Sequence, residues 1–243
     1  MAKKGNKKAA GKPDIQTREL KFGELISTGF EIYRRNFKLI FFIICIVYIP
    51  INIILNLLPV NEEDMFGSLF WYSNMAQVLE LVLGIISTMA IVYAVNKTVN
   101  NEKPELWDSL KSSILAWDKA ILTSLLAGVI LILLYICFII PGIIYSIYYS
   151  FFLYAVILKD IKYKKALDFS KSLVKGRWWR VFGILLATGL LITIAAGLIS
   201  SILGMFDTFL TNVISETVFD IVFALREVIV AVFFINLMNV KKV

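Results

Sequence analysis

The chain has 243 residues and a net charge of +7, and 59% of its residues are hydrophobic. A soluble domain typically has about 45–50% apolar residues, so the excess is expected to face lipid. The positive charge stands beside apolar segments, which favours anionic lipid headgroups as partners and argues against nucleic acid. The sequence has no histidine, no Cys-x-x-Cys and no Gly-rich phosphate loop. We therefore expect no metal, no cofactor and no catalytic site, and hence no enzyme.

The basic residues follow a partition along the chain. All but one of the 25 Lys and Arg residues fall in four segments, 1–38, 97–119, 159–180 and 241–242. The exception is Arg226. In multi-span membrane proteins, Lys and Arg concentrate in the cytoplasmic tails and loops. The partition therefore predicts that both termini and every second loop face the cytoplasm.

The first 18 residues are predicted to form a disordered basic cytoplasmic tail, because lysines alternate there with Gly, Ala and Pro. One interpretation is a solvated tail that sets the orientation of the chain. The other is a contact with anionic lipid, worth about 1 kcal/mol for each basic residue near the surface. The two are compatible. Residues 19–243 are then a six-span membrane domain.

A helix needs about 20 apolar residues to cross about 30 Å of hydrocarbon. The acidic, aromatic connector 60–76 is expected to lie at the outer interface. The uncharged run 120–158 would measure about 58 Å as one helix, so we expect a turn at Pro141-Gly142. The predicted spans are 39–59, 78–96, 120–140, 142–158, 181–203 and 218–239.

Each odd-numbered span is preceded by a cytoplasmic segment of one kind, in which a leading Leu is followed after about a dozen residues by an aromatic and a basic residue. Apolar residues recur there at helical spacing, as in Leu106 and Leu110, which predicts an amphipathic helix in the headgroup layer. The sequence therefore predicts an all-α protein of three units, each an interfacial helix followed by a two-span hairpin. The alternative is that any cytoplasmic loop needs such anchors. The predicted interfacial anchors are Arg34, Arg35, Phe37, Lys38, Trp117, Lys119, Arg177, Trp178, Trp179 and Arg180.

Four charged residues lie inside predicted spans, and they are Glu80, Asp220, Arg226 and Glu227. A charge at the bilayer centre costs about 2.5–3.5 kcal/mol even on a lenient scale, so these side chains should face the protein interior and pair. One hypothesis is an ion or proton path, or a polar substrate site. The other is structural pairing of Arg226 with one of the three acids. We favour pairing, because one cluster near one face is not a continuous path.

Three stretches carry a resemblance to a known family: 29–38 leading to Pro50, 140–142, and 166–182. Over about residues 20–240 the chain resembles the membrane domain found beside bacterial glycerophosphodiester phosphodiesterases, and its stand-alone relatives. The resemblance implies a six-helix integral membrane domain without catalytic residues. The linked phosphodiesterase is a separate soluble barrel that needs histidine, so its activity is not carried over. The pair Arg226-Glu227 is not part of the family pattern.

The expected function is that of a non-catalytic, multi-pass protein of the bacterial cytoplasmic membrane. Its role would be that of an accessory or scaffold protein, acting on lipid or on a partner membrane protein through the basic interfacial helices. The alternative is a small transporter or exporter component with a polar interior around Arg226 and Glu227; a membrane-embedded enzyme ranks third. A continuous polar cavity reaching both faces would favour transport, and a closed apolar bundle with lipid-filled grooves would favour the accessory role.

Overall fold

The computed structural model describes residues 15, 17–59, 61, 63–203 and 208–241, and within these ranges the chain is all-helical, without a strand. The predicted all-α class is therefore confirmed. The helices are α1 (Phe22–Arg35), α2 (Phe37–Asn56), α3 (Met65–Leu79), the π-helix η1 (Glu80–Gly84), α4 (Ile85–Val99), α5 (Leu106–Leu115), α6 (Trp117–Cys137), α7 (Ile139–Tyr148), α8 (Phe152–Lys159), α9 (Lys164–Val174), α10 (Trp178–Leu203) and α11 (Phe209–Lys241).

Five helical segments are long and apolar enough to cross a membrane, which indicates an integral membrane protein. They lie where the first five spans are predicted. The sixth predicted span, 218–239, falls inside α11, and α11 is not one of the five. The five segments are Phe37–Asn56, Met65–Val99, Trp117–Cys137, Ile139–Lys159 and Trp178–Ile199.

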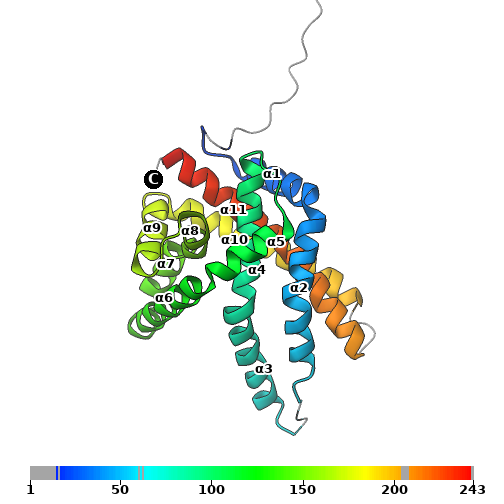
Figure 1. Cartoon of the computed structure of the whole chain (residues 1–243). Coiled ribbons are helices and arrows are strands. Elements are labelled where there is room, and N and C mark those ends of the chain that lie inside the picture. Colours follow the sequence, from blue (N-terminus) through cyan, green and yellow to red (C-terminus); the bar gives the residue numbers. More distant parts are fainter. Residues whose placement is uncertain (1–14, 16, 60, 62, 204–207, 242–243) are drawn as a thin grey trace, which may run out of the picture.

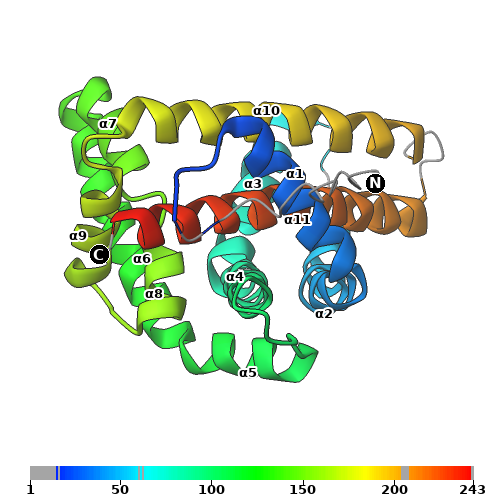
Figure 2. The same ribbon diagram turned by 90° about the horizontal axis from the view of Figure 1, so that it is seen from above.

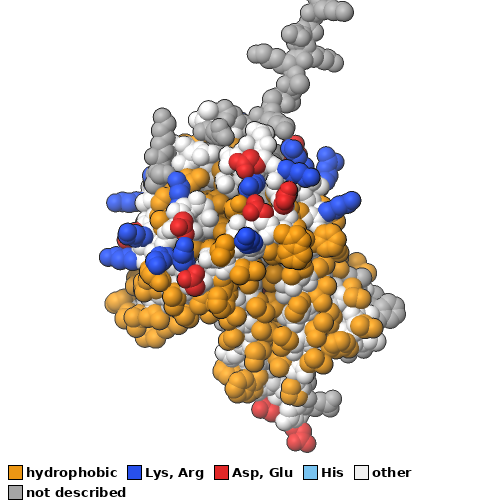
Figure 3. Space-filling model, viewed as in Figure 1, with side chains coloured by type: hydrophobic (Ala, Val, Ile, Leu, Met, Phe, Trp, Pro, Cys, Tyr) orange, Lys and Arg blue, Asp and Glu red, His pale blue; other side chains and the backbone are white. Residues whose placement is uncertain are grey.

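The long helices do not share one direction. In Figure 1, α2 and the rod formed by α3, η1 and α4 run down the view, and Figure 2 shows α2 and α4 end-on. In the same view α10 and α11 extend sideways along much of their length. Lys and Arg side chains gather on the upper part of the face in Figure 3, above a surface covered by hydrophobic side chains, with acidic side chains at the lower tip. This segregation is the surface pattern of a protein that lies partly in lipid.

The central element of the fold is α11. It packs against α10, α2, α1 and α4, and Figure 2 shows it passing through the middle of the molecule. Eight successive apolar residues of α11, from Val228 to Ile235, are buried. A helix that is apolar on every side is stable only when other elements surround it, and the four neighbouring helices do so here.

The second segment is longer than predicted, and the predicted connector 60–76 is wrong over most of its length. The α3 helix begins at Met65, because the side chain of Asp64 caps it by accepting a hydrogen bond from the backbone N–H of Gly67 (2.8 Å). From Met65 to Val99 the rod measures about 52 Å. The aromatic residues assigned to a loop, such as Phe66 with 82% of its surface exposed, project from this helix.

The turn inside 120–158 lies at Phe138, three residues before the predicted Pro141-Gly142. Phe138 is extended (φ −157°, ψ 120°), and it separates α6 from α7. Pro141 is in the first turn of α7, where a backbone N–H would have no partner within the helix, so proline is tolerated. A Cβ on Gly142 would lie 2.5 Å from the ring of Tyr135, and glycine therefore lets α6 and α7 approach.

Three short helices, α1, α5 and α9, precede α2, α6 and α10 at the positions predicted for amphipathic helices. Each buries one side against the rest of the protein, with Leu25 on α1, Leu110 on α5 and Leu167 on α9 as examples. Their other sides carry exposed residues such as Phe30. The location of these helices in the headgroup layer, and the grouping of the chain into three hairpins, stay predictions.

The start of α1 depends on a carboxylate. Glu24 accepts hydrogen bonds from the Arg18 guanidinium (2.6 and 2.8 Å) and from the Lys21 backbone N–H (2.8 Å). The bonds from Arg18 and then from Lys21 lower the pKa of Glu24 from 4.5 to about 2. A lowered pKa in the folded state stabilises the protein above pH 4.5, and the contribution is lost as the pH falls towards 2.

We therefore expect the melting temperature of the natural chain to fall further between pH 4.5 and pH 2 than that of Glu24→Gln, measured in the same detergent. Glu31→Gln is the control, because Glu31 is exposed on the same helix. It should follow the natural chain through this range. Parallel curves for all three proteins would mean that Glu24 does not stabilise the start of α1.

Candidate functional site

A hollow of about 760 Å³ lies between the start of α2 and the segment that follows α4, and we name it the basic hollow. Asn36, which separates α1 from α2, positions one wall: its side-chain amide donates to Ile32 O and to Thr98 Oγ1, both at 3.0 Å. Asn101 forms the tight turn of the other wall with a φ of 62°, a conformation that asparagine tolerates. The lining residues are Arg34, Arg35, Asn36, Phe37, Lys38, Leu39, Thr98, Asn101, Glu102, Lys103 and Pro104.

The charge of the basic hollow is strongly positive. Arg34, Arg35, Lys38 and Lys103 are all exposed, and none of them makes an ion pair within the described part of the chain. The one acidic lining residue, Glu102, pairs instead with Lys97 (3.3 Å). Guanidinium groups bind phosphate oxygens with two parallel hydrogen bonds, so this set of side chains fits a phosphate-bearing group.

An apolar groove of about 490 Å³ lies farther along α2, between α2, the η1–α4 rod and α5. Figure 1 shows α5 lying across the gap between α4 and α2. The groove walls include Val47, Ile86 and Ile114, with Lys111 as the one charged lining residue. From Asn36 to Val47 the distance along the helix is about 17 Å at 1.5 Å per residue. One leaflet of hydrocarbon is about 15 Å thick, half of the usual core.

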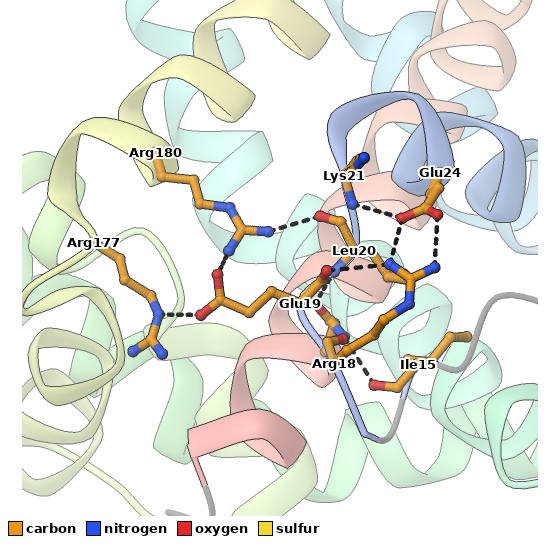
Figure 4. A network of polar contacts seen from close by, with 9 residues as sticks. Ile15, Arg18, Glu19, Leu20, Lys21, Glu24, Arg177 and Arg180 are labelled. Atoms are coloured by element: carbon orange, nitrogen blue, oxygen red, sulfur yellow. Dashed lines mark hydrogen bonds and ion pairs between the residues drawn. The ribbon is translucent and has the colours of Figure 1, made fainter.

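The predicted anchors Arg177 and Arg180 serve a different purpose. Arg177 Nε donates to Glu19 Oε1 (2.5 Å), Arg180 pairs with the other oxygen of Glu19, and Arg180 also donates to Leu20 O (2.7 Å). Figure 4 shows both guanidinium groups turned towards the segment before α1. These two arginines therefore hold the N-terminal segment against the start of α10, rather than standing open to headgroups.

The segment before α1 is also held by α11. The buried amide of Asn236 donates to Ile15 O (2.9 Å) and Arg18 O (2.7 Å), and it accepts from the Leu20 N–H (3.0 Å). Most of the predicted tail 1–18 lies outside the described residues. The described part of it is docked on α11 at these two carbonyls.

Some of the remaining predicted anchors are held by contacts inside the protein, and others are exposed. Trp117 donates its indole N–H to Val82 O (2.6 Å), a carbonyl of η1, and Trp178 donates to Ile144 O (3.1 Å). Lys119 pairs with Asp160 (2.5 Å). Trp179, with 78% of its surface exposed, projects outward in the manner of an interfacial anchor, and Phe37 is also exposed (43%).

A row of polar contacts joins α2 to α11. Asn56 donates to Glu216 (2.6 Å), and one helical turn away Asn52 donates to Asp220 Oδ2 (2.9 Å). The next turn of α2 carries Tyr48, which reaches Glu80 in η1 (3.1 Å to Oε2). The sequence analysis predicts a buried role for Glu80 and Asp220, but it missed Glu216 and the three α2 partners of these acids. The four-residue spacing of polar side chains in an otherwise apolar segment is the signal that would have found them.

The pair Arg226-Glu227 lies at the end of this row that is nearer to the C-terminus of α11. Arg226 Nη1 donates to Glu227 Oε1 (3.1 Å), and Tyr154 donates to Glu227 Oε2 (3.0 Å). Within the described part of the chain, Arg226 forms no ion pair with Glu80 or with Asp220. Of the four predicted residues, Arg226 and Glu227 therefore pair with each other, whereas Glu80 is bonded to Tyr48 and Asp220 is bonded to Asn52.

The polar row does not continue past Glu227. The next eight residues of α11 are buried and apolar, and the ring of Phe151 packs there against the rings of Phe233 and Phe234. No group of three or more acidic or sulfur side chains in the described ranges is placed to hold a metal ion.

Comparison of the chain with models of protein families, with curated proteins and with solved structures finds no match in any of the three.

Proposed function

We propose that this chain is a non-catalytic, multi-pass protein of the bacterial cytoplasmic membrane, which binds an anionic phospholipid of the cytoplasmic leaflet at the basic hollow. In this proposal α11 provides the sixth crossing, both termini are cytoplasmic, and the chain is related to the phosphodiesterase-associated membrane domain that it resembles. The observation that carries the proposal is that four basic residues surround one hollow and pair with no acidic residue in the described ranges; they are Arg34, Arg35, Lys38 and Lys103.

The apolar groove supports a lipid as the ligand rather than a free phosphate compound. The basic hollow and the groove lie along the same helix, about 17 Å apart, close to the distance from a headgroup phosphate to the ends of its acyl chains. A phospholipid with its phosphate among the guanidinium groups would place a chain beside Val47 and Ile114. The protein would then act as an accessory protein that holds or presents lipid to a partner in the same membrane.

Transport is the second candidate, and the polar row between α2 and α11 favours it. A transport path has to be polar from one face to the other. The buried apolar stretch from Val228 to Ile235 interrupts the row, and this argues for lipid binding over transport.

The test is binding of fluorescent phosphatidylglycerol to the full chain in detergent at low salt, with fluorescent phosphatidylcholine as the uncharged reference. Each basic residue near an anionic surface contributes about 1 kcal/mol, so Arg34→Gln/Arg35→Gln should weaken phosphatidylglycerol binding about 30-fold. Phosphatidylcholine binding should change little, and added salt should reduce the difference.

The control is Lys164→Gln/Lys165→Gln, which removes the same charge from exposed positions at the start of α9. It should leave phosphatidylglycerol binding within about twofold of the natural chain. Equal losses in the two double variants would mean that net charge, not the basic hollow, governs lipid binding, and the proposal would be withdrawn.

A further inference from the structure

A small cavity of about 20 Å³ lies between α2, α4 and α11, beside the polar row. Its size is that of one water-sized particle. Oxygen-bearing side chains make up a large part of its wall, and they are Tyr48, Ser87, Thr88, Asp220 and Glu227. The rest of the wall is apolar.

Ser87 is the residue that points to a ligand. Only 1% of its surface is exposed, and its hydroxyl has no hydrogen-bond partner in the described part of the protein. Buried hydroxyls in helices usually donate to the carbonyl four residues earlier, and Thr98 and Thr217 do so here (2.9 and 2.8 Å). For Ser87 that carbonyl belongs to Leu83 in the π-helix η1, where the helical register is shifted.

The charges beside the cavity are not balanced. Glu227 pairs with Arg226, whereas Asp220 makes no ion pair among the described residues and receives one hydrogen bond, from Asn52 to Oδ2. Its second oxygen, Oδ1, receives no hydrogen bond from the described residues. A carboxylate inside an apolar protein region is expensive unless a positive charge lies nearby.

We infer that this cavity binds one dehydrated monovalent cation of the size of Na⁺, held by Asp220, the Ser87 hydroxyl and neighbouring oxygens. Oxygen ligands are those that hard cations prefer. A bound water would satisfy Ser87 but would leave the charge of Asp220 uncompensated. A divalent ion is disfavoured because too few acids converge here. This inference is independent of lipid binding at the basic hollow, which involves other residues.

The experiment measures the melting temperature of the full chain in detergent at fixed ionic strength, with NaCl, KCl or choline chloride as the salt. A ligand that binds only the folded state raises its stability, so NaCl should raise the melting temperature by roughly 5 °C over choline chloride. KCl should give a smaller rise, because the cavity is small.

Two variants and one control locate the effect. In Ser87→Ala, the NaCl concentration that gives half of the rise in melting temperature should be at least ten times higher than in the natural chain. Asp220→Asn should abolish the rise. If Asp220→Asn does not fold, Ser87→Ala alone decides. Ser124→Ala is the matched control, because Ser124 also has a buried hydroxyl without a partner but lies on α6; it should keep the full response. Equal melting in NaCl and choline chloride, or an unchanged response in Ser87→Ala, would overturn the inference.

Discussion

Replacing Gly29 by alanine is expected to lower the free energy of unfolding by about 2–3 kcal/mol. A Cβ at this position would lie 2.5 Å from Ile229 Cγ1 and 3.0 Å from the Ile229 Cα. The second contact is with the backbone of α11, which cannot rotate away as a side chain can. The added methyl group therefore has to push α1 off the central helix. Thermal melting in detergent measures the loss.

Gly23→Ala is the matched control for this prediction. Gly23 belongs to the same helix, and a Cβ there meets nothing within 4 Å. An alanine in place of glycine restricts the unfolded chain and favours the helix by roughly 0.5–1 kcal/mol, so this variant should melt at the same temperature or slightly higher. Equal destabilisation by both substitutions would show that helix propensity, and not the contact with Ile229, controls the site.

Asn236→Leu is expected to cost about 3 kcal/mol. The substitution keeps a side chain of similar size but removes the three hydrogen bonds that Asn236 makes with the segment before α1. It leaves the buried Leu20 N–H and the carbonyls of Ile15 and Arg18 without this partner, and each buried group left unsatisfied costs about 1–3 kcal/mol. The same segment should also become sensitive to trypsin at Arg18 and Lys21.

The control is Asn74→Leu on α3. Asn74 is exposed, and its amide donates to Phe70 O within its own helix (2.7 Å). Its replacement should change stability by less than about 0.5 kcal/mol and leave trypsin cleavage near Arg18 unchanged. Slow, natural-like cleavage in Asn236→Leu would mean that the arginine contacts of Glu19 hold the segment without help from α11.

Local patterns in the sequence predict the features that depend on local chemistry. The five apolar segments follow from runs of about 20 apolar residues. The short helices α1, α5 and α9 follow from apolar spacing, as in Leu106 and Leu110. The position of the turn at Phe138 was not predicted. Proline is a strong turn signal, but it is also common in the first turn of a helix, where Pro141 lies.

Long-range partners could not be read from the sequence. Arg177 and Arg180 have the sequence pattern of headgroup anchors, and no residue near them in the chain indicates that Glu19 forms ion pairs with both. The partners of the buried acids were missed for the same reason, since Asn52 and Asp220 are 168 positions apart. The extent of α3 was missed because the enrichment of aromatic residues at a membrane interface indicates where a segment lies and not whether it is helical.

The position of α11 has a consequence for how the protein is made. This helix follows all the other described helices in the chain, yet it is the element around which α1, α2, α4 and α10 pack. During synthesis the earlier helices would enter the membrane before α11 is made. The side of α1 that carries Gly29 would then lack the helix against which it packs. Nascent chains stalled before residue 228 should then be the form that quality-control proteases and insertion chaperones recognise.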